Sequence, residues 1–184
     1  LQLLSELSPE HFIIRPNKGM DTAALDECIK NIPSYEYYIV LHDDHWFSHD
    51  DWFEQLLVLM QMDTSTAAYG NLVTSCPYNS PEFEVFFDIV TTAIGYEDYH
   101  IADFPHYLQG MAGIFRKSAI ERLLRQDGVP HTHGNHKKIV EVCERMLSYV
   151  LLRDGAVLKQ LPPGYELFLR HRQHNISVTN TASP

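Results

Sequence analysis

The feature that most constrains the fold is an unbroken apolar run, Tyr37–Leu41, which leads directly into an acidic, histidine-rich segment. A run without polar alternation is typical of a strand covered on both faces, the usual case in parallel sheets. The residues before it predict a strand over His11–Arg15 and a helix over Met20–Ile32. Together they predict a βαβ unit, with the acidic segment at the carboxyl end of a central parallel strand. Ligands of open α/β sheets bind at such ends.

The first acidic motif, HDDH at residues 42–45, follows this strand directly. Asp43, Asp44 and His45 are therefore candidate metal ligands, because carboxylates and imidazoles bind divalent cations. A solvated loop after the strand is the alternative interpretation.

The second motif, HDD at residues 49–51, carries a different prediction. Ser48-x-x-Asp51 resembles a capping box, and the apolar residues that follow have the spacing of an amphipathic helix. Asp50 and Asp51 are then acids of the first helical turn, facing the positive end of the helix dipole. This motif needs no metal ion to explain it.

The rest of the chain continues to alternate between strands and helices. Further strands are predicted over Ala67–Thr74, Met111–Phe115 and 156–161, with a last one from Tyr165. Further helices are predicted around Phe83–Val90, from a Ser118-x-x-Glu121 capping box to Gly128, and over Lys137–Asp154. At 184 residues the chain is long enough for one domain, 1–184, of the α/β class.

Charge, apolar content and cysteine spacing limit the partners and the location that we expect for this protein. The formal charge of −10 argues against nucleic acid as the main partner. No run approaches the roughly 20 apolar residues that a transmembrane segment needs. Cys28, Cys76 and Cys143 stand far apart without a CxxC spacing, which fits a reducing compartment, so we expect a cytoplasmic protein.

The predicted helix over Lys137–Asp154 carries a carboxylate at the edge of its apolar stripe. Glu144 is in line with Val140 and Leu147, so partial burial would raise its pKa toward working pH. Alternatively, Glu144 forms a surface ion pair with a cation on the same helix: Lys137, Lys138 or Arg145.

Four motifs, in this order, resemble the family 2 inverting glycosyltransferases, which have a GT-A fold. "NKG" resembles the family's N-x-G segment, and "YYIVLHDDHWF" resembles the strand that delivers the D-x-D metal motif. "YLQGMAGIFRKSAIERL" resembles the acceptor-side strand and helix, and "CERMLSYVLLRDG" resembles the helix of the E-D motif. His171 or His174, near the last strand, resembles the family's C-terminal metal histidine.

The resemblance implies a GT-A-like α/β domain, with a mostly parallel central sheet flanked by helices. Residues 1–76 would form the donor and metal half, and 77–184 the acceptor half. The implied activity is that of a hexosyltransferase, moving a sugar with inversion from a nucleotide-sugar donor to a glycan or other hydroxyl acceptor. Mn²⁺ or Mg²⁺ would neutralise the departing diphosphate.

The resemblance also implies roles for individual residues. Glu144 would act as the general base that takes the acceptor's proton. The donor would be contacted by Asn17, Lys18, Gly19 and Gly110. The metal would be held by Asp43, Asp44, His45, His171 and His174.

The sequence departs from the family pattern in three ways. The family's first βαβ unit should precede "HFIIR", where only about ten residues stand, so we expect an N-terminally incomplete domain. The E-D pair is Cys143-Glu144, so one carboxylate is missing. The D-x-D register is open: either Asp43 and His45 bind the metal, or Asp44 is the main ligand.

Two other functions stay open. The loop "HTHGNH" supplies His131, His133 and His136, which together with HDDH could form the site of a metallohydrolase. A polar loop near the acceptor explains the same histidines. A non-catalytic remnant that keeps the fold for binding or assembly is favoured by the missing first unit and the lost acid.

Overall fold

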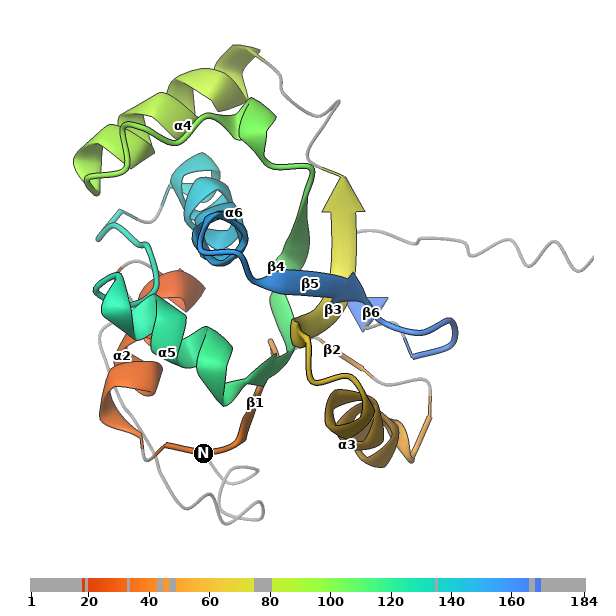
Figure 1. The fold of residues 1–184 in the computed structure, drawn as a ribbon. Helices are drawn as coiled ribbons and strands as arrows, with labels where there is room; N and C mark the ends of the chain where they lie inside the picture. Colours follow the sequence, from red (N-terminus) through yellow and green to blue (C-terminus); the bar gives the residue numbers. More distant parts are fainter. Residues whose placement is uncertain are drawn as a thin grey trace, which may run out of the picture.

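A computed structural model describes residues 18, 20–32, 34–42, 45–46, 49–74, 81–134, 136–165 and 168–169 (Figure 1). The helices are α2 (Met20–Asn31), α3 (Trp52–Met62), α4 (Pro81–Ala93), the 3₁₀ helix η1 (Ile101–Asp103), α5 (Lys117–Arg125) and α6 (Lys137–Arg153). The strands are β1 (Tyr37–Val40), β2 (His45–Trp46), β3 (Thr66–Thr74), β4 (His106–Arg116), β5 (Val157–Gln160) and β6 (Phe168–Leu169). The predicted α/β class is confirmed. In the described part of the chain, no helix combines the length and apolarity needed to cross a membrane.

The main sheet has four strands in the order β1-β4-β3-β5. β4 runs antiparallel to β1, with Val40 opposite Gly113, and antiparallel to β3, with Ala68 opposite Phe115. Only β3 and β5 are parallel neighbours among the described strands. The sheet is therefore mixed rather than mostly parallel, because β4 returns between two strands that precede it in the chain.

β1 differs from the central parallel strand that its apolar run predicts. Among the described strands it pairs only with β4, so it stands at one edge of the sheet. All four of its residues are half-buried rather than fully covered. The predicted strand over His11–Arg15 lies outside the described residues, and the βαβ unit is therefore not tested.

Helices cover both faces of the sheet (Figure 1). Tyr69 and Ile114 pack with Leu56 of α3 on one face. On the other face, Ala68 and Phe115 join the larger core built around α6. Successive residues of a strand point to opposite faces of the sheet, so β3 and β4 contribute side chains to both cores. The sheet therefore lies between α3 on one face and α6 on the other, and α4 packs against α6.

α6 is the helix around which the larger core forms. Val142, Met146 and Tyr149 have no exposed surface, and the apolar stripe predicted for this helix is confirmed. Asp154 caps the carboxyl end, and Gly155 follows with a φ of 75°. Left-handed backbone is the usual ending of a helix, and glycine adopts it without steric cost.

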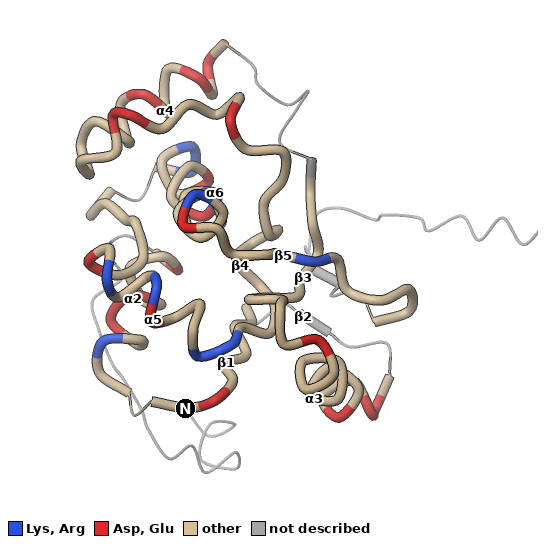
Figure 2. Tube along the Cα trace, viewed as in Figure 1, with Lys and Arg blue, Asp and Glu red and all other residues tan. Residues whose placement is uncertain are grey.

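Acidic side chains dominate the outermost helix. α4 carries Glu82, Glu84 and Asp88 and no lysine or arginine, as Figure 2 shows along the helix. Its buried residues, including Phe83 and Phe87, face α6. This outer surface would repel a polyanion.

The predicted Ser118 capping box is not present, and Ser48 of the other predicted box lies outside the described residues. α3 begins after Asp51, whose side chain makes no capping hydrogen bond. α5 begins after Arg116, so Ser118 and Glu121 lie inside the helix rather than at its cap. The predicted end of this helix at Gly128 agrees better with the structure. α5 ends at Arg125, and the N–H of Gly128 donates to the carbonyl of Leu123 at 2.8 Å.

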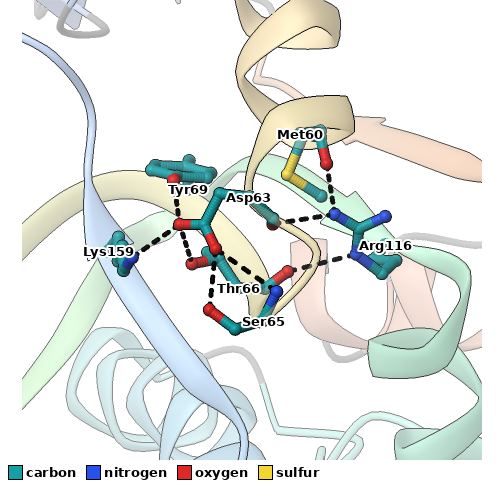
Figure 3. A network of polar contacts seen from close by, with 7 residues as sticks. All are labelled: Met60, Asp63, Ser65, Thr66, Tyr69, Arg116 and Lys159. Atoms are coloured by element: carbon teal, nitrogen blue, oxygen red, sulfur yellow. Dashed lines mark hydrogen bonds and ion pairs between the residues drawn. The ribbon is translucent and has the colours of Figure 1, made fainter.

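A polar junction built on Asp63 joins α3 to the sheet (Figure 3). The Asp63 carboxylate accepts hydrogen bonds from Thr66 Oγ1 at 2.8 Å and Tyr69 Oη at 2.7 Å. It also accepts from the backbone N–H of Ser65 at 3.2 Å and its hydroxyl at 2.7 Å, and it pairs with Lys159 Nζ at 2.5 Å. These donors, Lys159 first, hold the pKa of Asp63 far below its usual range.

Arg116 completes the junction from β4. Its guanidinium donates to the carbonyl of Thr66 at 3.2 Å, to that of Asp63 at 3.1 Å and to that of Met60. The last turn of a helix leaves such carbonyls without partners inside the helix. Arg116 therefore satisfies the carboxyl end of α3 while Asp63 binds β3 and β5.

Candidate functional site

The structure describes only part of the predicted site. Lys18, Gly110 and Glu144 lie within the described residues. The backbone of His45 is described in β2, opposite Leu169 of β6. The remaining predicted residues, and the side chain of His45, lie outside the described residues: Asn17, Gly19, Asp43, Asp44, His171 and His174.

Four elements meet where β1 ends. Asp21 comes from the first turn of α2, His42 follows β1, Gly110 lies in β4 and Glu144 in α6. His42 Nδ1 lies 3.8 Å from Asp21 Oδ2. A Cβ atom placed on Gly110 would lie 3.4 Å from His42 Cε1. The glycine thus leaves room for the imidazole, and the charge of His42 acts on Glu144.

β4 is irregular at this point. Gly70 and Leu72 of β3 face Gly113 and Leu108, so β4 bulges over the residues between them. Gly110 has a φ of 58°, and Met111, which is fully buried, has a φ of 57°. A left-handed methionine is a sparsely populated conformation, and such strain gathers at functional sites. The bulge lies beside His42, and β-bulges are frequent next to active sites.

The burial of Glu144, although incomplete, raises its pKa from 4.5 to about 7. His42 acts in the opposite direction, whereas the carboxylates of Asp21 and Glu141 raise the pKa further. A carboxyl group with a pKa near 7 can both accept and release a proton at neutral pH, which is the property of a general base or acid.

The alternative prediction, a surface ion pair, does not describe Glu144. Among the described residues, Lys138 pairs with Glu141 at 3.2 Å instead. The guanidinium of Arg145 lies over two aromatic rings, 4.1 Å from the centre of Phe83 and 4.5 Å from that of Tyr107. No ion pair of Glu144 is present among the described residues, and burial raises the pKa of Glu144 more than Arg145 lowers it.

The described residues alone do not provide a metal site. Within the described ranges, no three His, Cys, Asp or Glu side chains lie close enough to hold one ion. Asp21 and His42 offer two donors at the end of β1. The predicted ligands from residues 43–45 and from the carboxyl-terminal segment fall outside the described residues, and this prediction is not tested.

The histidine loop does not supply a metal site within the described residues either. His131 Nδ1 lies 2.9 Å from the carbonyl of Val129. The rings of His131 and His133 are 6.0 Å apart and nearly perpendicular. The ring of His136 stacks on Phe86 at 5.0 Å, and its Nδ1 accepts the N–H of Lys138. The three imidazoles therefore have separate local roles.

The sequence does not indicate that Asp21 lies beside His42, and it shows His42 only as the first residue of the HDDH motif. Asp21 is explained by its place at the start of α2, where acids are common, so nothing local marks it as part of a site. The available signal is the predicted βαβ geometry, which brings a helix start near the end of a strand. Glu144 can be found because the helical period is a strong pattern.

No protein-family model, curated protein or solved structure matches this chain. We therefore infer the function from the residues of the site.

Proposed function

We propose that this chain is an inverting, metal-dependent glycosyltransferase that moves a sugar from a nucleotide-sugar donor to a glycan or other hydroxyl acceptor. The observation that carries the proposal is the partly buried Glu144 carboxyl near the end of the strand that leads into Asp43-Asp44. The mixed sheet covered by helices on both faces is compatible with a GT-A fold. The separated cysteines favour the cytoplasm as its location.

In this proposal Glu144 takes the proton of the acceptor hydroxyl as the oxygen attacks the sugar. Its pKa of about 7 suits this step, because base strength and the ionised fraction are both useful near neutral pH. Once protonated, the carboxyl is neutral and fits its partly desolvated surroundings better. Asp21 lies 3.8 Å from His42, and the absence of a side chain on Gly110 leaves room for the imidazole.

A bound Mn²⁺ or Mg²⁺ would stabilise the negative charge of the departing diphosphate. Asp43, Asp44, His45, His171 and His174 are the proposed ligands, and oxygen and imidazole donors suit these ions. Asn17, Lys18, Gly19 and Gly110 are the proposed donor contacts.

A non-catalytic remnant is the second candidate, and Cys143 is the observation that favours it. It stands where the resemblance expects a carboxylate, and its side chain is buried in the core. Burial raises the pKa of the Cys143 thiol to about 11, so it stays protonated and cannot replace an acid. Glu144 would then have to supply the base function alone.

The proposal is tested by nucleotide binding and turnover. UDP or GDP together with Mn²⁺ should raise the melting temperature, since a ligand that binds only the folded state stabilises it. Asp43→Ala or Asp44→Ala should remove this Mn²⁺-dependent increase, and His171→Ala or His174→Ala should reduce it. Asp50→Ala and Asp51→Ala are matched controls that should retain it.

Turnover of UDP- and GDP-sugars with sugar acceptors separates the candidates. Binding without any turnover would favour the remnant. Stabilisation that is lost in the Asp50 and Asp51 variants but kept in the Asp43 and Asp44 variants would move the metal site to the second motif. A protein that neither nucleotide stabilises would overturn the transferase proposal.

A further inference from the structure

A pocket of about 350 Å³ lies away from Glu144, between the turn that follows α4 and the loop that follows α5. Its lining includes Lys30, Tyr96, Gln126, Gly128 and His131. Small-molecule sites usually measure about 300–1,000 Å³, so the pocket is large enough for one small ligand. The residues grouped around Glu144 do not line it.

A buried carboxylate holds the wall of this pocket in place. Asp26 is 6% exposed and accepts the N–H of Val129 at 2.8 Å. Its carboxylate also lies 3.0 Å from Lys30 Nζ and 3.8 Å from His131 Nδ1. A side chain on Gly128 would collide with this carboxylate, since its Cβ would lie 1.9 Å from Asp26 Oδ1. The loop after α5 is therefore fixed before any ligand arrives, which lowers the entropic cost of binding.

Charged groups of both signs lie at the pocket. Lys30 Nζ lies between the carboxylates of Asp26, at 3.0 Å, and Asp127, at 3.9 Å. A phosphate or other anion would meet these two acids, and a cation would meet Lys30. The environment therefore disfavours strongly charged ligands of either sign.

The remaining lining suits a hydroxyl-rich molecule. Gln126 offers both a donor and an acceptor, and Lys30 offers donors. Tyr96 contributes a half-buried ring whose hydroxyl donates to the carbonyl of Gln126 at 3.2 Å. An aromatic ring beside mixed donors and acceptors matches a sugar ring, which has apolar C–H faces and a rim of hydroxyls.

We propose that this pocket binds one neutral sugar unit at a site separate from Glu144. The proposal does not rest on the transferase activity, because binding here uses neither Glu144 nor a metal ion.

The test is a titration of the ¹⁵N-labelled full chain, followed by the backbone amide signals. The neutral probes are glucose, galactose and N-acetylglucosamine, with maltose, lactose and chitobiose to distinguish a free sugar from the end of a glycan. Inorganic phosphate and spermidine are the charged probes. A neutral sugar should shift the amide signals of Gly95, Gly128 and Val129, with saturation at millimolar concentration.

Variants separate this pocket from its surroundings. Gln126→Ala should weaken sugar binding by about threefold to tenfold, the loss of one hydrogen bond. Tyr96→Ala should weaken it at least as much, because the aromatic face is removed. Glu97→Ala is the matched control: it is exposed, adjacent to Tyr96 and outside the lining, and should leave binding unchanged. Glu144→Gln should also retain full binding.

Three results would overturn the proposal. Shifts of these amides by phosphate or spermidine but by none of the sugars would assign the pocket to a charged ligand. Unshifted amides with every sugar at ten times a millimolar dissociation constant would remove the site. Sugar binding that Gln126→Ala leaves unchanged, in a variant whose other amide signals match the parent, would place the sugar elsewhere.

Discussion

Asp63 and Glu144 are two carboxylates that the same fold treats in opposite ways. Asp63 is surrounded by hydroxyls, a backbone N–H and the ammonium group of Lys159, and its pKa lies far below the usual range. Glu144 is partly buried, has no ion pair among the described residues, and has a pKa of about 7. One carboxylate is held charged and the other is close to losing its charge at neutral pH.

The difference indicates which acid stabilises the fold and which is available for chemistry. Each donor around Asp63 favours its ionised form, so Asp63 is charged at neutral pH and stabilises the fold. The environment of Glu144 destabilises its ionised form, and this costs stability at neutral pH. A carboxyl group whose pKa burial raises toward 7 is therefore the better candidate for proton transfer.

The largest expected effect concerns Glu144 and turnover. Glu144→Gln keeps the size of the side chain but cannot accept a proton, so turnover should fall by roughly 10²–10⁴-fold. The measurement is initial rate with whichever nucleotide-sugar and acceptor the parent protein uses, at saturating Mn²⁺. Nucleotide binding should be retained.

Glu141→Gln is the matched control, since Glu141 lies on the same helix and pairs with Lys138. Its turnover should stay within about twofold of the parent, because an ion pair near the surface contributes little. If Glu144→Gln turns over at the parent rate, Glu144 is not the base, and Glu141 and Asp103 are the next acids to test.

The second prediction concerns stability rather than turnover: Asp63→Asn should destabilise the fold without a direct effect on catalysis. The amide has one acceptor oxygen in place of two and leaves Lys159 without its charged partner. The melting temperature should fall by several degrees. Asp98→Asn is the control, because Asp98 is exposed and pairs mainly with Arg153; its melting temperature should fall less. Equal decreases would show that the junction adds nothing beyond one ion pair.

The third prediction is that the two acids give stability opposite dependences on pH. The folded-state pKa of Asp63 is lowered from 3.8, so its stabilisation is present above that value and is lost as the pH falls below it. The folded-state pKa of Glu144 is raised from 4.5 to about 7, so the folded state binds more protons in this window. Stability should therefore decrease as the pH rises from 4.5 to 7.

Chemical denaturation at several pH values checks these signs. Relative to the parent, Glu144→Gln should become more stable between pH 4.5 and 7, by at most roughly 3 kcal/mol for a shift of this size. Asp63→Asn should instead approach the parent as the pH falls below 3.8. If the difference in stability between the parent and the Glu144→Gln variant does not change between pH 4.5 and 7, burial does not raise the pKa of Glu144.

The comparison also shows what the sequence could predict. The α6 stripe and the place of Glu144 at its edge follow from helical periodicity, which needs only local information. The mixed sheet could not be predicted from the sequence. An apolar run such as that of β1 indicates a strand, but it does not show whether the neighbouring strand is parallel or antiparallel. The Asp63 junction could not be predicted from the sequence either, because Asp63 and Lys159 are almost a hundred positions apart in the chain.

The smallest expected effect concerns Asp51, at the opposite end of the helix that Asp63 caps. Position alone favours Asp51, because a carboxylate is stabilised at a helix amino terminus and disfavoured at the carboxyl terminus. Its contacts are few, however: the side chain makes no capping hydrogen bond and, among the described residues, accepts from Gln55 Nε2 at 3.0 Å on an exposed surface.

Asp51→Ala should therefore cost less than about 0.5 kcal/mol, the value of one exposed helix pair plus a screened dipole term. The measurement is chemical denaturation at low and at high salt, where the small loss should shrink further as the dipole is screened. Mn²⁺-dependent nucleotide binding should be unchanged in the same variant. A loss comparable to that of Asp63→Asn would mean that position on the helix, rather than the number of donors, decides how much each acid contributes.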